Sequence, residues 1–106
     1  MSGQLPDVVG RGDVVWVEDP FALTDTADEE GPDHPYVVIS TDEHPFHGLE
    51  YLAMLITSTG RSAGVRIPDS AWTFGDLTRE SWISPWVVVT IKHAGLDGYQ
   101  GSLGES

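Results

Sequence analysis

Residues 33–59, DHPYVVISTDEHPFHGLEYLAMLITST, contain two apolar runs joined by a polar link. The first run, residues 35–40, is rich in β-branched and aromatic side chains, and the second, residues 51–56, stops at a cluster of turn-forming residues. Such short runs are typical of buried strands, because helices in proteins generally need about ten residues or more. A link of about ten residues allows the two strands to pair antiparallel. The sequence therefore predicts a strand pair at the centre of a small β-barrel.

Length and composition predict one globular domain. With 106 residues, 40% of them apolar, the chain has enough material for one core. We treat residues 1–106 as a single domain with its core at about residues 11–91, a loose N-terminal lead and a glycine-rich C-terminal tail. The chain has no cysteine, which excludes disulfides and thiolate metal sites. It shows neither an apolar stretch of membrane-spanning length nor a signal peptide, and we expect a cytoplasmic protein.

The charge of the chain is unusual. Seventeen acidic residues face five basic residues, for a net charge of −12, beyond the magnitude of about 2–8 that suits a small soluble domain. One interpretation is a halophilic acidic surface that keeps the protein soluble in concentrated salt. The other is a surface that binds a basic partner or mimics nucleic acid. The acids are spread from Asp7 to Glu105, which favours high-salt adaptation.

Further segments show strand patterns. Residues 13–18 form an apolar run, residues 64–68 alternate polar and apolar, and residues 81–91 form a long β segment that Pro85 divides. A proline inside such a segment predicts an edge position, a bend or a bulge. We expect a helical turn within residues 69–79 and an irregular tail from Ala94. Five or six short antiparallel strands with little helix predict an all-β fold, a small closed SH3-like barrel.

Two polar loops are candidate functional segments. Residues 19–34 hold six acids and no base, and loops of this length are often functional or mobile, although a solvated surface loop is the alternative. Residues 42–47, DEHPFH, place two histidines beside two carboxylates, which are ligand types that zinc accepts. Pro45 breaks any helical face there, and the spacing matches no closed zinc pattern. We therefore predict no metal site.

The stretches RGDVVWV at 11–17, HPYVVIS at 34–40 and ITST at 56–59 resemble, in order and spacing, the MazF/PemK family of type II toxin–antitoxin toxins. The likeness covers about residues 11–91. It implies an SH3-like barrel, usually a homodimer, that inhibits growth by cleaving single-stranded RNA without a metal or other cofactor. It also implies a cognate antitoxin whose tail occupies the RNA groove, with the loop of residues 19–34 lying over that groove.

The resemblance also implies a catalytic site. By position, the catalytic arginine of the family falls on His34 and its catalytic threonine on Thr57, with Ser58 beside them. Cleavage by the ribose 2′-OH needs a base, an acid and donors for the charge of the phosphorane. A histidine can serve as base or acid, since its reference pKa is about 6.5, but it lacks the permanent charge and fork geometry of arginine. Arg61 and Arg66, which follow soon after Thr57, are candidates to bind substrate and replace that cation.

Each role has a simpler alternative. His34 precedes a proline and can be an ordinary loop residue, while Thr57 and Ser58 can be turn residues that bond their own backbone. The two arginines can pair with surface acids. For the whole protein, the alternatives to a toxin are a catalytically inactive relative that binds RNA or an antitoxin, and an unrelated acidic interaction protein.

The net charge also bears on RNA binding. Affinity for RNA comes largely from neutralising phosphates, so a chain of charge −12 predicts no RNA binding in dilute buffer. At molar salt the Debye length is only about 3 Å, and binding would rest on hydrogen bonds and base stacking. The candidate stacking residues are Trp16, Trp72, Trp82 and Trp86.

Overall fold

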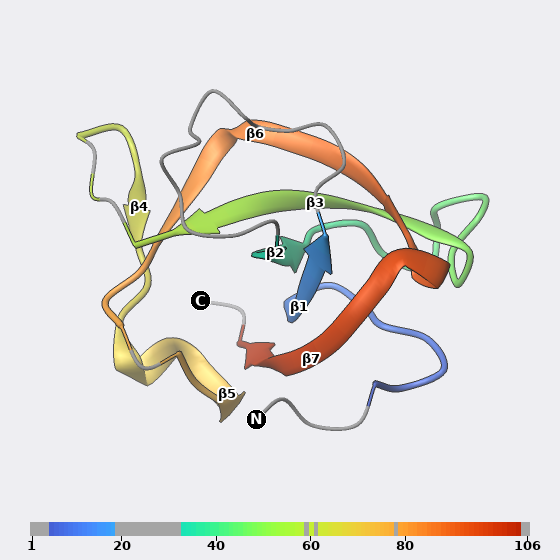
Figure 1. Cartoon of the computed structure of the whole chain (residues 1–106), viewed down its shortest axis with the longest axis horizontal. Coiled ribbons are helices and arrows are strands. Elements are labelled where there is room, and N and C mark those ends of the chain that lie inside the picture. Colours follow the sequence, from blue (N-terminus) through green and yellow to red (C-terminus); the bar gives the residue numbers. More distant parts are fainter. Residues whose placement is uncertain (1–4, 19–32, 59, 61, 78, 105–106) are drawn as a thin grey trace.

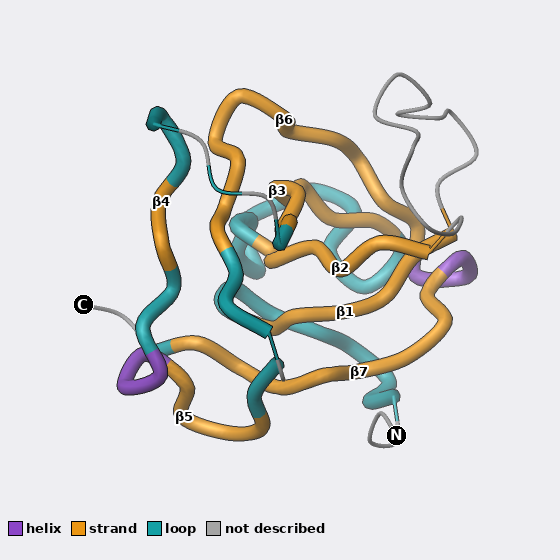
Figure 2. The backbone as a smooth tube through the Cα atoms, turned by 60° about the vertical axis from the view of Figure 1, so that its left-hand side comes forward, coloured by secondary structure: helices purple, strands orange, loops and turns teal. Residues whose placement is uncertain are grey.

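The computed structural model describes residues 5–18, 33–58, 60, 62–77 and 79–104 (Figure 1). Most of the acidic loop therefore lies outside the described residues, as does Arg61. Seven strands form one antiparallel sheet in the order β4-β6-β3-β2-β1-β7-β5. The sheet curls into a half-barrel (Figures 1 and 2).

The strands are β1 (Asp13–Glu18), β2 (Asp33–Val38), β3 (Glu50–Thr57), β4 (Val65–Arg66), β5 (Trp72–Gly75), β6 (Trp82–Lys92) and β7 (Leu96–Leu103). Two short 3₁₀ turns, η2 (Asp69–Ala71) and η3 (His93–Gly95), precede β5 and β7. The predicted all-β class with little helix is confirmed. The expected central strand pair is β2 and β3, which pair antiparallel. Closure is partial, because the end strands β4 and β5 do not pair with each other.

The C-terminal tail differs from its prediction. The glycine-rich segment expected to be irregular forms β7, which pairs with both β1 and β5. The expected helical turn is limited to η2, and β5 follows it directly. Gly75 has φ +73°, and a side chain there would strike the Gln100 carbonyl. A side chain at Gly101 would likewise strike the Phe74 carbonyl. The glycines thus allow two strands to approach closely. From composition alone, a segment so rich in glycine was predicted to be irregular.

The N-terminal lead also differs from its prediction as a loose segment. Val9 is 1% exposed and belongs to a core cluster, and Leu5 packs against that cluster. The described part of the lead, residues 5–10, is therefore held by apolar burial, although it forms no strand.

Alternation of side chains along the strands separates two core clusters. The successive residues Val14 and Val15 belong to different clusters, as do Val37 and Val38. The larger cluster consists of Val9, Val15, Val17, Tyr36, Val38, Tyr51, Ala53, Leu55, Ile91 and Leu96. The smaller consists of Val14, Val37, Ile56 and Ile67, with Ala71, Trp72 and Leu77 among the side chains packed against it. The segment from β4 to β5 therefore covers one face of the sheet.

The predicted interruption at Pro85 is confirmed as a bulge. Met54 pairs with Val88, whereas the next residue, Leu55, pairs with Ser84. Residues 85–87 are therefore extra on β6, and a bulge is a position where the missing N–H of proline is tolerated. No helix in the described part of the chain is long and apolar enough to cross a membrane.

Candidate functional site

His34 and Thr57 come to the same end of the sheet on neighbouring strands. The pairing of β2 with β3 ends at Tyr36 and Leu55; continuing this register by two residues would place His34 opposite Thr57. On its other side, His34 is the register partner of Val17 in β1. The fold thus places the two residues to which the family resemblance gives catalytic roles at the same end of neighbouring strands. Both are partly exposed.

Trp82 and Arg66 extend this row across the sheet. Thr57 pairs with Trp82 of β6, and Trp82 pairs with Arg66 of β4. Because neighbouring strands lie about 4.8 Å apart, the Arg66 backbone is about 10 Å from that of Thr57 and about 14 Å from that of His34. We call His34, Thr57, Trp82 and Arg66 the transverse row. Arg66 lies at its far end and is not the immediate neighbour of His34.

Arg66 is engaged by a carboxylate. Its Nε and Nη2 lie 2.9 Å and 2.8 Å from Oε2 of Glu80. Both side chains are more than half exposed, so the pair is solvated and remains accessible to a ligand. Glu80 was not part of the predicted site. Its negative charge partly balances that of Arg66, the one cation of the transverse row.

The turn after β3 lies against the row. Ser58 is exposed directly after Thr57, and a Cβ at Gly60 would come within 2.9 Å of the Trp82 ring. The backbone at position 60 therefore touches the indole. Trp82 was considered in the sequence as one of four stacking candidates, and the β3–β6 register places it beside Thr57.

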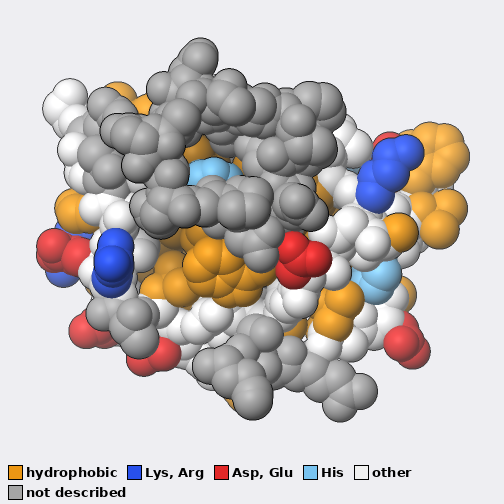
Figure 3. All heavy atoms as spheres, viewed as in Figure 1, with side chains coloured by type: hydrophobic (Ala, Val, Ile, Leu, Met, Phe, Trp, Pro, Cys, Tyr) orange, Lys and Arg blue, Asp and Glu red, His pale blue; other side chains and the backbone are white. Residues whose placement is uncertain are grey.

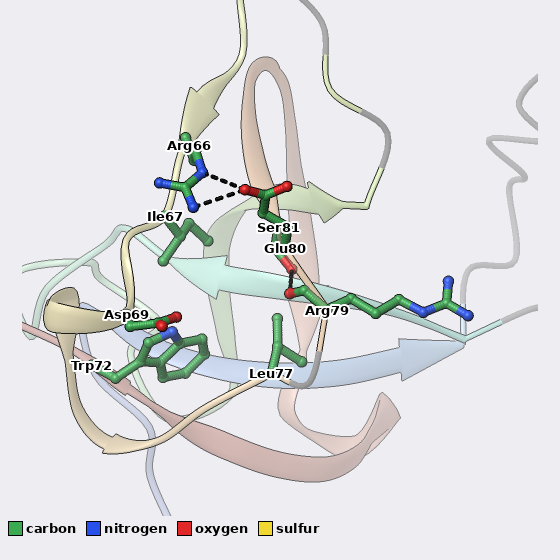
Figure 4. Close-up of a pocket in the computed structure, with 8 residues that line it drawn as sticks. All are labelled: Arg66, Ile67, Asp69, Trp72, Leu77, Arg79, Glu80 and Ser81. Atoms are coloured by element: carbon green, nitrogen blue, oxygen red, sulfur yellow. Dashed lines mark hydrogen bonds and ion pairs between the residues drawn. The ribbon is translucent and has the colours of Figure 1, made fainter.

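A pocket of about 250 Å³ opens beside Arg66 (Figure 4). Its lining consists of Arg66, Ile67, Asp69, Trp72, Leu77, Arg79, Glu80 and Ser81. Figure 4 shows Arg66 directed toward Glu80, whereas the Arg79 side chain extends away from the other lining residues. The lining holds two basic and two acidic side chains, so it is no purely cationic phosphate site.

Basic side chains are sparse on the face seen in Figure 3. Lys and Arg lie toward two sides of the described surface, while hydrophobic side chains and a histidine lie nearer its centre. This distribution differs from the continuous basic groove that would bind RNA through phosphate neutralisation alone.

The two histidines of the β2–β3 link make local contacts, His44 within the turn and His47 with a buried tyrosine. The Phe46 N–H donates to His44 Nδ1 at 3.0 Å, and the His47 ring packs edge-on against Tyr51 with centroids 5.5 Å apart. Within the described ranges no group of three or more His, Asp or Glu side chains is arranged to hold a metal ion.

The fold and the row together define a small all-β half-barrel protein with a polar site at one end of its sheet. A family model described as the PemK-like, MazF-like toxin of type II toxin–antitoxin systems matches residues 10–106. The chain belongs to this family, as its sequence motifs predicted.

Among solved structures, the chain is similar to one described as an endoribonuclease in complex with its cognate antitoxin from mycobacterial species. The TM-score is 0.66 at 17% identity, and the match covers 93% of this chain and 80% of that chain. At this identity the likeness supports the fold. No curated protein matches the sequence.

Proposed function

We propose that this protein is the toxin of a type II toxin–antitoxin pair and that it inhibits growth by cleaving single-stranded RNA in the cytoplasm. The proposal rests on the membership of the chain in the PemK-like, MazF-like toxin family and on the location of His34 and Thr57 at the same end of the neighbouring strands β2 and β3. The structural neighbour, an endoribonuclease bound to its cognate antitoxin, gives further support.

In the proposed reaction the ribose 2′-OH attacks the adjacent phosphorus, and the bond to the 5′ oxygen of the next nucleotide breaks. His34 of β2 accepts the proton of the 2′-OH as general base. The hydroxyls of Thr57 and Ser58 donate hydrogen bonds to the charged phosphorane oxygens. Solvent protonates the leaving oxygen. The products are a 2′,3′-cyclic phosphate and a free 5′-OH, and the scheme needs neither a metal nor a cofactor.

Arg66 is proposed to bind substrate rather than the reacting phosphate. Its backbone is about 10 Å from Thr57 by strand spacing, which suits a phosphate further along the RNA. Arg61 is proposed for the same role on the grounds of sequence, and it lies outside the described residues. The proposed partners are a cognate antitoxin and a second copy of the chain.

The proposed working condition is concentrated salt. A net charge of −12 opposes RNA in dilute buffer, whereas at about 1 M salt repulsion is screened beyond about 3 Å. Hydrogen bonds from the row and stacking on a partly exposed indole such as Trp82 are then sufficient to hold a single strand.

One observation favours a second candidate, a catalytically inactive binding module. The cation of the row, Arg66, is paired with Glu80, and a histidine occupies the position of the family's arginine. Such a module would bind RNA or an antitoxin without cleaving.

Induced expression separates the two candidates. A nuclease stops growth of the host and leaves RNA ends with 2′,3′-cyclic phosphates, and His34→Ala or Thr57→Ala restores growth at equal protein level. If His34→Ala stops growth as well as the wild type does, the proposed site is wrong. A wild type that stops growth without producing such RNA ends supports the binding module.

A further inference from the structure

Among the described residues, the outer edge of β6 is unpaired along most of its length. β6 runs along the upper side of the half-barrel in both views (Figures 1 and 2). One edge pairs with β3 from Trp82 to Lys92, whereas the other pairs with β4 at Ile83 and Trp82. Between Ser84 and Lys92, no strand of the described chain pairs with that second edge. Its backbone N–H and C=O groups therefore have no strand partner among the described residues, and an added strand could pair with them.

This edge has few of the features that usually block strand addition. Natural edges are protected by charged side chains, prolines, bulges or short length. Here Pro85 and its bulge lie near one end and Lys92 at the other. Between them, residues 87–91 read VVVTI, without a charge or a proline. These are residues with high strand propensity, so the segment is suited to accept a partner strand.

An apolar surface lies beside the open edge. Val88 is 47% exposed, Trp86 53% and Leu52 37%. Leu52 of β3 pairs with Thr90, so Val88 is its diagonal neighbour on the same face. Leu49 is 71% exposed and lies at the Lys92 end of the strand, where its carbonyl accepts the N–H of His93 at 2.9 Å. We call residues 84–92 with Leu49 and Leu52 the β6 edge surface.

In dilute buffer, where charges are not screened, the net charge of the chain distinguishes between possible occupants. A second copy would bring together two bodies of net charge −12, which repel under that condition. An extended peptide with basic residues is attracted instead. Two exposed acids, Asp42 and Glu43, lie in the link between β2 and β3 that leads to Leu49. Alternate apolar side chains of the added peptide would lie on Val88 and Leu52.

We infer that the β6 edge surface binds an extended, net-basic peptide segment of a protein partner as an additional antiparallel strand. The surface begins at Ser84, two residues beyond Trp82 of the transverse row, and extends away from it along β6. Its Lys92 end pairs with Glu50, whereas the row crosses β3 at Thr57, about 23 Å away along that strand. This inference goes beyond the proposed activity and does not depend on cleavage.

The test uses the full chain at 0.1 M KCl and a labelled ten-residue peptide of alternating valine and lysine. We expect saturable binding by fluorescence anisotropy and slower amide hydrogen exchange within residues 84–92. Val88→Arg places a like charge against the peptide and should weaken binding about tenfold or more. Val65→Arg is the matched control, because Val65 is a similarly exposed strand valine (53%) on β4, and it should bind as the wild type does.

Two control peptides define the mode of binding. A version N-methylated at alternate residues cannot complete the strand ladder and should not bind, and a version with glutamate for lysine should be repelled. The inference is overturned if the basic peptide fails to bind the folded wild type, if the N-methylated peptide binds equally well, or if Val88→Arg has no effect. A dimer of the wild type that Val88→Arg dissociates would instead assign the surface to a second copy. Single-stranded RNA that competes with the peptide would assign it to substrate.

Discussion

Arg66 on β4 directs two nitrogens, Nε and Nη2, at the same oxygen of Glu80, at 2.9 Å and 2.8 Å. Glu80 thus holds the one cation of the transverse row at the edge of the pocket (Figure 4). Glu80→Gln removes the balancing charge and should raise RNA affinity in 2 M KCl, whereas Arg66→Gln should lower it. Because both side chains are more than half exposed, either change should alter the free energy of unfolding by less than about 1 kcal/mol.

Filter binding and denaturant unfolding of the two variants check this prediction. Equal RNA affinity of Glu80→Gln and Arg66→Gln would show that Arg66 does not contact the strand. A large loss of stability in either would show a structural role for the pair.

Gly12 joins three strands, which explains a glycine in the first sequence motif. Its φ is +95°, and a Cβ there would lie 2.6 Å from the Leu103 carbonyl oxygen. Its N–H donates to the Val38 carbonyl and its carbonyl accepts the Leu103 N–H, each at 2.8 Å. Gly12→Ala should therefore reduce the free energy of unfolding by about 1–3 kcal/mol or more. Gly95→Ala is the control, since nothing lies within 4 Å of its Cβ position, and thermal unfolding of both variants provides the measurement.

Tyr51 connects the N-terminal lead to the segment after β6. Its side chain is fully buried; its hydroxyl accepts the Val9 N–H at 3.4 Å and shares a 2.8 Å hydrogen bond with His93 Nδ1. Tyr51→Phe leaves a buried donor without its partner and should cost about 1–3 kcal/mol of unfolding free energy. Denaturant titration measures this loss. A Tyr51→Phe variant as stable as the wild type would mean that the lead is held by the burial of Val9 alone.

Tyr99 should give the protein an alkaline pH dependence. Burial raises the pKa of Tyr99 above its ordinary value of 10.0, and the charge of Asp13 and a hydrogen bond to that carboxylate raise the pKa further. The Tyr99 hydroxyl donates to Asp13 Oδ1 at 3.4 Å. The raised pKa means that the folded state favours the neutral phenol. This contribution to stability is complete below about pH 10 and is lost as the pH rises through the folded pKa.

The difference in ultraviolet absorbance between wild type and Tyr99→Phe isolates this titration. Its midpoint should lie above 10, and the variant should lose less stability than the wild type as the pH rises beyond that value. A midpoint at or below 10 would contradict the prediction.

Local sequence rules predicted most of the fold. Apolar runs with turn formers at their ends identified β1, β2, β3 and β6. Pro85 predicted an edge position, a bend or a bulge, because proline limits both the ladder and the backbone angles around it, and the structure has a bulge there. The tail was misjudged for a related reason. Gly75 and Gly101 permit a close approach between two strands, and a single sequence does not distinguish this use of glycine from disorder.

The candidate site was predictable in part. His34 and Thr57 were proposed from motif positions, and the antiparallel strands β2 and β3 carry them to the same end of the sheet. Trp82 and Glu80 joined the site through pairings between segments far apart in the chain, such as Thr57 with Trp82. Such pairings depend on how the whole sheet assembles, and no local pattern encodes them.

The central claim is that His34 acts in the place of the family's arginine. The most direct measurement is cleavage of single-stranded RNA by purified protein in 2 M KCl, with His34→Ala and His34→Arg beside the wild type. We predict cleavage by the wild type and its loss in His34→Ala. An inactive wild type together with an active His34→Arg variant would contradict the claim. The site would then have retained its geometry, while His34 would be unable to replace the arginine in catalysis.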